Sequence, residues 1–181
     1  MAFALNPAAA IDGVIDYGTI EGRKLYGYAT KKLDEELFDC NAEGLYQFLQ
    51  SLGNRASEYG WDNDAEGIIK IPENDIDADA ELFSLIEEYG QLTMERIREY
   101  DTTYIDTDGR QAQNSYMLYQ CLMNSISKEG KKKILIWKDD YTIDEYKSGN
   151  LLLKVIIRES HIDTEKATSI QTPRPQTFVP N

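Results

Sequence analysis

The segment RQAQNSYMLYQCLMNSIS, residues 110–127, decides the fold that we expect for this chain. Its apolar and aromatic side chains recur at steps of four and three, which is the spacing of one face of a helix. This face consists of Ala112, Tyr116, Tyr119, Met123 and Ile126. Leu118 and Leu122 widen the face, whereas Met117 and Cys121 fall on the opposite side. The segment is therefore predicted to be a helix that is apolar on nearly all sides.

The same helix carries no charge. No charged residue occurs from Gln111 to Ser127, although 28% of the chain is charged, and such a helix is usually buried. A membrane span is the competing interpretation, but a span needs roughly 20 mainly apolar residues. Too many amide side chains interrupt this helix, namely Gln111, Gln113, Asn114, Gln120 and Asn124. We expect it to be the central helix of a soluble core.

The first part of the chain contains two predicted helices, each behind a capping residue. Thr19 can cap the first helix, and either Asp39 or Asn41 can cap the second, at residues 42–59, which Gly60 ends. The apolar positions of the first are Leu25, Tyr26, Ala29 and Leu33. Those of the second are Leu45, Phe48, Leu49, Leu52, Ala56 and Tyr59.

Residues 61–80 show no helical period, and Pro72 prevents a continuous helix through them, so we expect a loop across the surface. Acidic residues lead from this loop into a further predicted helix, which Gly90 ends. The acids are Glu73, Asp75, Asp77, Asp79 and Glu81. The apolar positions of that helix are Leu82, Leu85, Ile86 and Tyr89.

Thr93 caps another predicted helix, in which Leu92 and Ile97 form a hydrophobic staple. Asp108, three residues before Gln111, can then open the central helix in an arrangement like a capping box.

The chain becomes basic after the central helix. The apolar run at residues 134–137 fits either a short helix capped by Ser127 or a strand, and we favour the helix. Residues 151–160 keep helical spacing again. From Thr164 onward the chain has prolines and no periodicity, which indicates a disordered tail.

These segments predict an all-α fold, a compact helical bundle of about five to seven helices. We expect an N-terminal arm over residues 1–16, a helical domain over 17–163 and a disordered, proline-containing tail over 164–181. The arm would dock Ile11, Val14 and Ile15 onto the core. A chain of 181 residues with 41% hydrophobic content is long enough for one such domain.

The composition narrows the choice of partners. A net charge of −13 opposes attraction to phosphate backbones, so nucleic acid is not the expected main partner. A solvated helix end explains the densest group of lysines, although this group could contact RNA. It comprises Lys128, Lys131, Lys132 and Lys133. Cys40 and Cys121 predict no disulfide framework, and without a signal peptide we expect a cytoplasmic protein that binds no membrane.

One acidic segment imitates a calcium-binding loop. Asp75, Asp77 and Asp79 resemble its first ligands, but Ala80 stands where the turn needs glycine. Ile86 stands where a bidentate glutamate belongs. We expect no specific calcium binding here.

Other chemical motifs are equally weak. His161 is the single histidine and lies at the predicted end of a helix, which favours a capping role over a zinc site or a catalytic triad. The run Asp-Thr-Asp-Gly at residues 106–109 interrupts an aspartic-protease motif and is better explained as a turn and cap. We expect no enzyme activity, no catalytic, cofactor-binding or metal-binding residue, and no cofactor.

The pattern of apolar positions resembles the capsid-like region of Gag proteins from copia-type LTR retrotransposons. The similarity begins where an aromatic residue and an aspartate precede a helix with paired apolar anchors, at Phe38, Asp39, Leu45, Phe48 and Leu49. It continues in the first part of the chain at Gly22, Lys24, Leu25, Tyr26, Ala29, Thr30, Leu33, Arg55, Ala56, Gly60 and Trp61. Later positions that agree are Leu122, Asn124, Ser125, Ser127, Gly130, Gly149, Leu151, Leu152, Leu153 and Ile157. The resemblance covers about residues 11–163.

This resemblance implies an all-helical capsid-type lobe that packs against copies of itself and has no enzyme activity. Members of the family usually continue into a second helical lobe, and some end in a zinc knuckle that binds RNA. Here the matching region gives way to the proline-containing tail, so the resemblance implies either a truncated or a decayed copy of a Gag.

Two other classes of function stay open. A helical adaptor that docks one partner through a tyrosine-rich surface is consistent with the 12 tyrosines. An enzyme that uses carboxylates alone needs no histidine. Its candidate acids are Glu87, Glu88, Glu95 and Glu99, although these also fit the wet face of a helix.

Overall fold

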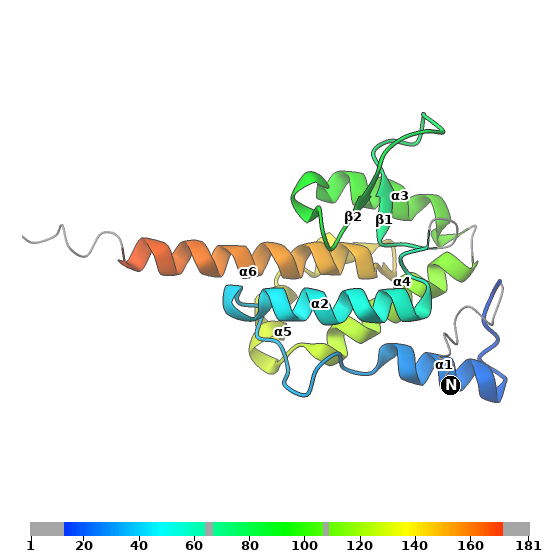
Figure 1. The fold of residues 1–181 in the computed structure, drawn as a ribbon, viewed down its shortest axis with the longest axis horizontal. Helices are drawn as coiled ribbons and strands as arrows, with labels where there is room; N and C mark the ends of the chain where they lie inside the picture. Colours follow the sequence, from blue (N-terminus) through cyan, green and yellow to red (C-terminus); the bar gives the residue numbers. More distant parts are fainter. Residues whose placement is uncertain (1–12, 64–66, 107–108, 172–181) are drawn as a thin grey trace, which may run out of the picture.

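The computed structural model describes residues 13–63, 67–106 and 109–171, with side chains described as far as residue 162. Within these ranges the chain is mostly helical, which confirms the all-α prediction (Figure 1). The helices are α1 (Ile20–Thr30), α2 (Ala42–Tyr59), α3 (Met94–Ile105), α4 (Gly109–Ser125), α5 (Lys128–Leu135) and α6 (Gly149–Gln171). Two antiparallel hairpins join them, β1 (Lys70–Pro72) with β2 (Leu82–Ser84) and β3 (Thr142–Ile143) with β4 (Tyr146–Lys147). The short 3-10 helices are η1 (Tyr89–Gln91) and η2 (Lys138–Tyr141).

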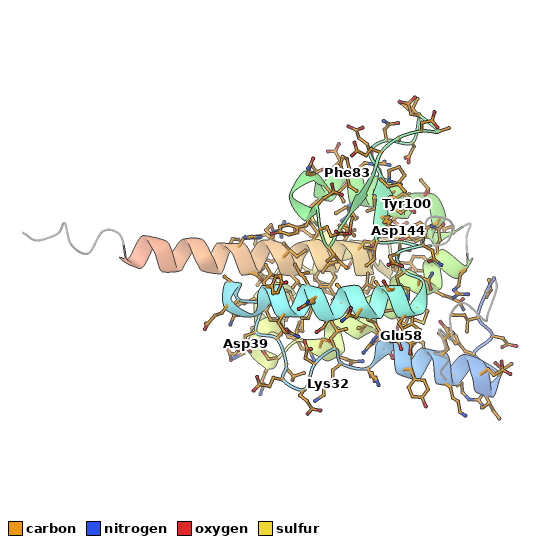
Figure 2. All side chains as sticks on the ribbon, viewed as in Figure 1. Lys32, Asp39, Glu58, Phe83, Tyr100 and Asp144 are labelled. Carbon is orange, nitrogen blue, oxygen red and sulfur yellow. The ribbon has the colours of Figure 1, made fainter. Side chains whose placement is uncertain are left out.

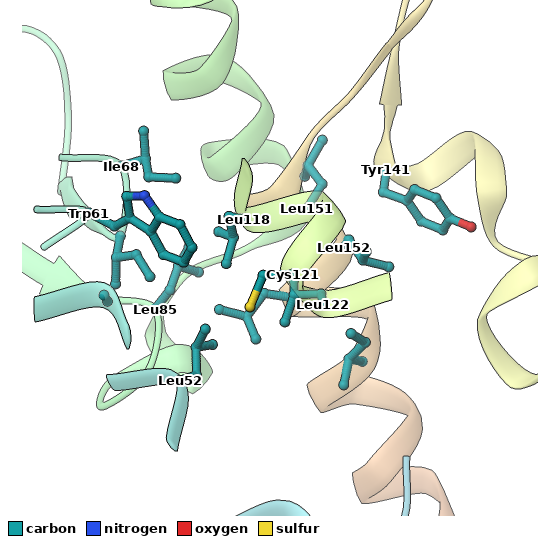
Figure 3. Close-up of a cluster of buried hydrophobic side chains, with 14 of the residues drawn as sticks. Leu52, Trp61, Ile68, Leu85, Leu118, Cys121, Leu122, Tyr141, Leu151 and Leu152 are labelled. Atoms are coloured by element: carbon teal, nitrogen blue, oxygen red, sulfur yellow. The ribbon is translucent and has the colours of Figure 1, made fainter. Parts of the chain in front are cut away.

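Helix α6 shares the centre of the fold with α4. Its first half is at most 1% exposed at Leu151, Leu152, Leu153, Val155, Ile156 and Ile157. It contacts α2, α3, α4 and α5, and Figure 1 shows α2 running alongside it. The packing on α4 is so close at Gly149 that a Cβ there would lie 2.5 Å from the Ser115 carbonyl oxygen. Figure 3 shows leucines of α6 meeting Leu118, Cys121 and Leu122 of α4 in the core.

The central helix buries Leu118 and Leu122 as predicted, but it also buries the side opposite to the predicted face. Met117, Leu118, Cys121 and Leu122 are fully buried, whereas Tyr116 is 44% exposed. Of the other predicted core positions, Tyr119, Met123 and Ala112 are only partly buried. The helix also ends at Ser125, so Ile126 is buried outside it, in a parallel bridge with Phe38. The cause is that α6 packs on α4 at Leu118 and the end of α1 packs on it at Cys121, while Tyr116 stays exposed.

Four predicted N-terminal caps are confirmed, and at α2 the cap is Asn41 and not the alternative Asp39. Thr19, Asn41, Thr93 and Ser127 each accept a hydrogen bond from the backbone N–H three residues ahead, at 2.9, 2.9, 3.0 and 3.1 Å. Gly60 ends α2 in the left-handed conformation, with φ of 77°. These local signals fixed the helix starts correctly because each needs only one side chain and its own next turn. Asp108, the predicted cap of α4, lies outside the described residues.

The predicted helix over residues 82–89 is wrong. The chain instead pairs Lys70 with Ser84, Ile71 with Phe83 and Pro72 with Leu82 in the β1–β2 hairpin. The hairpin forms because it buries side chains on the predicted surface loop. They are Trp61, Ile68, Ile69 and Ile71, and they pack with Leu85 (Figure 3).

The C-terminal half contains two further results. Residues 128–135 form α5, as favoured, but Leu135 and Ile136 remain 63% and 75% exposed. Helix α6 runs on to Gln171, so the disordered tail predicted from Thr164 is wrong over residues 164–171. Residues 172–181 lie outside the described part of the chain.

The N-terminal arm docks through Ile15. Its side chain is 2% exposed. The Ile15 backbone N–H donates to the amide oxygen of Gln113 at 2.7 Å, and the Ile15 carbonyl accepts from the amide nitrogen of the same side chain at 2.8 Å. Val14 is 63% exposed, so the prediction that it docks is wrong. Ile11 lies outside the described residues.

Candidate interaction surfaces

The strongest candidate for chemistry is a buried carboxylate, Asp101 on α3. It is 0% exposed and accepts hydrogen bonds from the Tyr104 hydroxyl at 2.8 Å, the Asn150 amide at 2.9 Å and the Ser148 hydroxyl. Burial is the main cause that raises its pKa to about 6, and these three donors oppose the shift. Ser148 also accepts the Leu151 N–H at 3.0 Å, so the network holds the N-terminus of α6 against α3. With no access to solvent, the network is a structural joint.

A second buried charge, Arg55, holds the C-terminal end of α1. The Arg55 guanidinium on α2 donates to the carbonyls of Ala29 and Lys31, each at 2.8 Å, at the C-terminus of α1. The side-chain amide of Asn124 on α4 donates a hydrogen bond to the Thr30 carbonyl at 2.7 Å. A cation at a helix C-terminus complements the macrodipole, so Arg55 joins α1 and α2 through the backbone carbonyls that it binds.

The calcium-like segment forms the turn of the β1–β2 hairpin. Asp75 is engaged by Arg96 of α3 through two contacts of 2.9 and 3.1 Å, and this hydrogen-bonded pair lowers the pKa of the carboxyl. Asp77 and Asp79 are exposed. The Asn74 side chain accepts the N–H groups of the two residues that follow Asp75, both at 2.9 Å, which sets the turn. The expectation of no specific calcium binding stays a prediction.

His161 lies within α6, ten residues before its end, so its predicted place at a helix C-terminus is wrong. Its ring centroid is 5.4 Å from that of Tyr89. Asp106 is the C-terminal cap of α3, and the next two residues of the protease-like run lie outside the described residues.

The structure separates the four candidate acids of the enzyme hypothesis. Glu88 accepts the Ser84 N–H at 3.2 Å, and Glu87 lines a hollow beside α2. Glu95 and Glu99 share a groove of about 590 Å³ between the hairpin and α3. In this groove the Arg96 guanidinium contacts Glu99 at 3.4 Å as well as Asp75. Within the described residues, no three acids, cysteines or histidines are arranged to hold a metal ion.

The lysine group is not uniform. Lys133 donates to the Cys40 carbonyl at 3.1 Å, and Lys132 lies 3.6 Å from Glu129. Lys128 and Lys131 are exposed. Leu135 and Ile136 beside them are exposed, which the apolar run in the sequence does not reveal.

The tyrosine surface lies over α1 and α4. Tyr17, Tyr26 and Tyr116 line a hollow of about 530 Å³ together with Arg23. Tyr17 meets Tyr26 edge to face at a centroid distance of 5.3 Å, and Tyr116 stacks with Tyr119 at 6.2 Å. Burial raises the pKa of Tyr17 to about 12, so this ring stays neutral at ordinary pH. The sequence signalled a tyrosine-rich surface but placed Tyr116 in the core.

Within the described residues, no helix is both long enough and apolar enough to cross a bilayer. Comparisons with known proteins give no match, whether to family models, to curated proteins or to solved structures.

Proposed function

We propose that this chain is a structural, self-associating Gag or capsid-like protein of a retrotransposon, acting in the cytoplasm and without enzyme activity. The apolar residues that carry the resemblance support this proposal, because they lie in the hydrophobic core or pack against it. Leu45, Phe48 and Leu49 are buried on α2, and Phe38 stacks on Phe48 at a centroid distance of 4.4 Å. The self-contacts of a capsid-type lobe need such a rigid body beneath them.

The observation that carries the proposal is the exposed tyrosine surface. Neutral aromatic rings are enriched where proteins meet, because they bury a large area and keep one polar end. Tyr17 and Tyr116 are 37% and 44% exposed and flank one hollow. Subunits of charge −13 repel one another, so an apolar contact through this surface should strengthen as salt screens the repulsion.

The second candidate is an adaptor that docks one partner on the same surface. It differs from the first in its stoichiometry, because it would form a defined dimer or heterocomplex and no larger assembly. The tyrosines favour both candidates equally, so the size of the assembly must separate them.

Sedimentation velocity at low and high salt, over a wide range of protein concentrations, tests the proposal. We expect species larger than a dimer that increase with both salt and concentration. Tyr116→Glu should remove the species that salt promotes, while Tyr146→Glu, which changes a 53% exposed tyrosine on β4, should leave them unchanged. A wild-type chain that stays monomeric in both salts would overturn the proposal and leave the adaptor.

A further inference from the structure

The end of α5 combines positive charge with exposed apolar side chains. We call this surface the basic tip, and it consists of Lys131, Lys132, Leu135, Ile136 and Lys138. Lys131 and Lys132 lie four and three residues before Leu135, so the lysines and the leucine share one side of the helix. Leu135 and Ile136 are large aliphatic residues that remain 63% and 75% exposed. Adjacent exposed aliphatic residues with a polar border are typical of a docking surface.

The turn of the β1–β2 hairpin has the complementary composition. We call it the acidic tip, and it consists of Glu73, Ile76, Asp77, Asp79 and Glu81. Ile76 is 92% exposed among these acids. The turn is fixed by the Asn74 side chain, by the bond from the Glu73 N–H to the Glu81 carbonyl at 2.8 Å and by the Asp75 pair with Arg96. A fixed turn loses little entropy on docking.

The two tips lie on opposite sides of the molecule. Figure 1 shows the hairpin turn projecting on one side, beyond α3, and α5 on the other side, beneath α2. Figure 2 shows side chains of the turn extending away from the helices, beyond Phe83. The tips therefore cannot meet within one chain, whereas the acidic tip of one copy can reach the basic tip of another.

We infer that the acidic tip of one chain docks on the basic tip of a second copy, with Ile76 against Leu135 and Ile136. The lysines and carboxylates set the direction of the contact, because two acidic tips or two basic tips repel each other. The apolar contact supplies affinity that exposed ion pairs alone do not. Each copy keeps one tip free, so the contact is heterologous and can propagate into rings or open arrays. This inference rests on the proposed self-association and names one of its contacts.

Charge reversal with mixing tests the inference at low ionic strength, where charges act over the longest range. One variant carries Lys131→Glu and Lys132→Glu, and the other carries Asp77→Lys and Asp79→Lys. Each variant alone should lose the association that the wild type shows in sedimentation, because the first variant has two negative tips and the acidic tip of the second has no net charge. An equal mixture should recover pairs, because the unchanged acidic tip of the first variant meets the unchanged basic tip of the second. Misfolding of either variant would not be cured by mixing.

The apolar centre has its own test. Ile76→Ser should weaken this association roughly tenfold, whereas Ile20→Ser, at a 65% exposed isoleucine on α1, should leave it unchanged. If the wild type associates but the mixture does not recover, the inference is wrong and the proposed function stands on another contact. If the lysine variant instead loses binding to a single-stranded RNA probe and still associates, the basic tip serves RNA and the inference is also wrong. If the wild type never associates, the proposed function itself fails.

Discussion

Asp101 should make the stability of this protein fall as pH rises, which is the opposite of the usual effect of a carboxylate. Its carboxyl is enclosed at the joint between α3 and α6, and burial raises its pKa from 3.8 to about 6. A raised pKa means that the folded state holds the proton more tightly than the unfolded state does. The stabilisation is therefore complete below pH 3.8 and is lost as pH rises through 6. A difference of about two pKa units corresponds to about 3 kcal/mol of folding free energy.

The assay compares urea unfolding of the wild type and Asp101→Asn at about pH 4 and about pH 7.5. The other titrating groups are shared by both chains, so the difference between the two unfolding free energies isolates this carboxyl. The wild type should lose about 3 kcal/mol relative to the variant across this range. Asp79→Asn, at an exposed aspartate, should show no such trend. A constant difference, or one that grows in favour of the wild type with pH, would refute the reasoning and show that the three hydrogen-bond donors outweigh burial.

Three further predictions concern stability and ions. Arg55→Ala should lower the free energy of unfolding in urea by about 2–4 kcal/mol, because it leaves carbonyls at the end of α1 without their donor. A loss below about 0.5 kcal/mol would mean that water replaces the guanidinium as the donor. Met117→Ala should cost about 2–5 kcal/mol and Met123→Ala clearly less, and the reverse order would restore the face of α4 expected from sequence. Calorimetry should find no saturable calcium binding, and a millimolar or tighter site abolished by Asp75→Ala would contradict this.

The parts of the fold that the sequence predicted are those that depend on local chemistry. Thr19, Asn41 and Ser127 bond to their own next turn, so their caps form whatever the rest of the chain does. Gly60 ends α2 for an equally local reason, since the left-handed conformation it adopts carries no penalty for glycine.

The errors arose where a distant segment decides. Leu85 belongs to a run of apolar residues with helical spacing. Its backbone N–H nevertheless donates to the Ile69 carbonyl at 3.0 Å, so a hairpin forms in place of the helix. Spacing alone could not choose between two apolar faces of α4, because the choice depends on where α6 packs. The exposure of Ile76 and Ile136 could not be predicted from the sequence, because it depends on which distant segments pack nearby. An apolar residue in a sequence is normally assigned to the core.

Static light scattering at high ionic strength, as protein concentration rises, tests the central claim of self-association most directly. The proposed function predicts an average mass that climbs past a dimer and continues to rise with concentration. A mass that stays at the 20.7 kDa of one chain, or stops at a dimer, would contradict it.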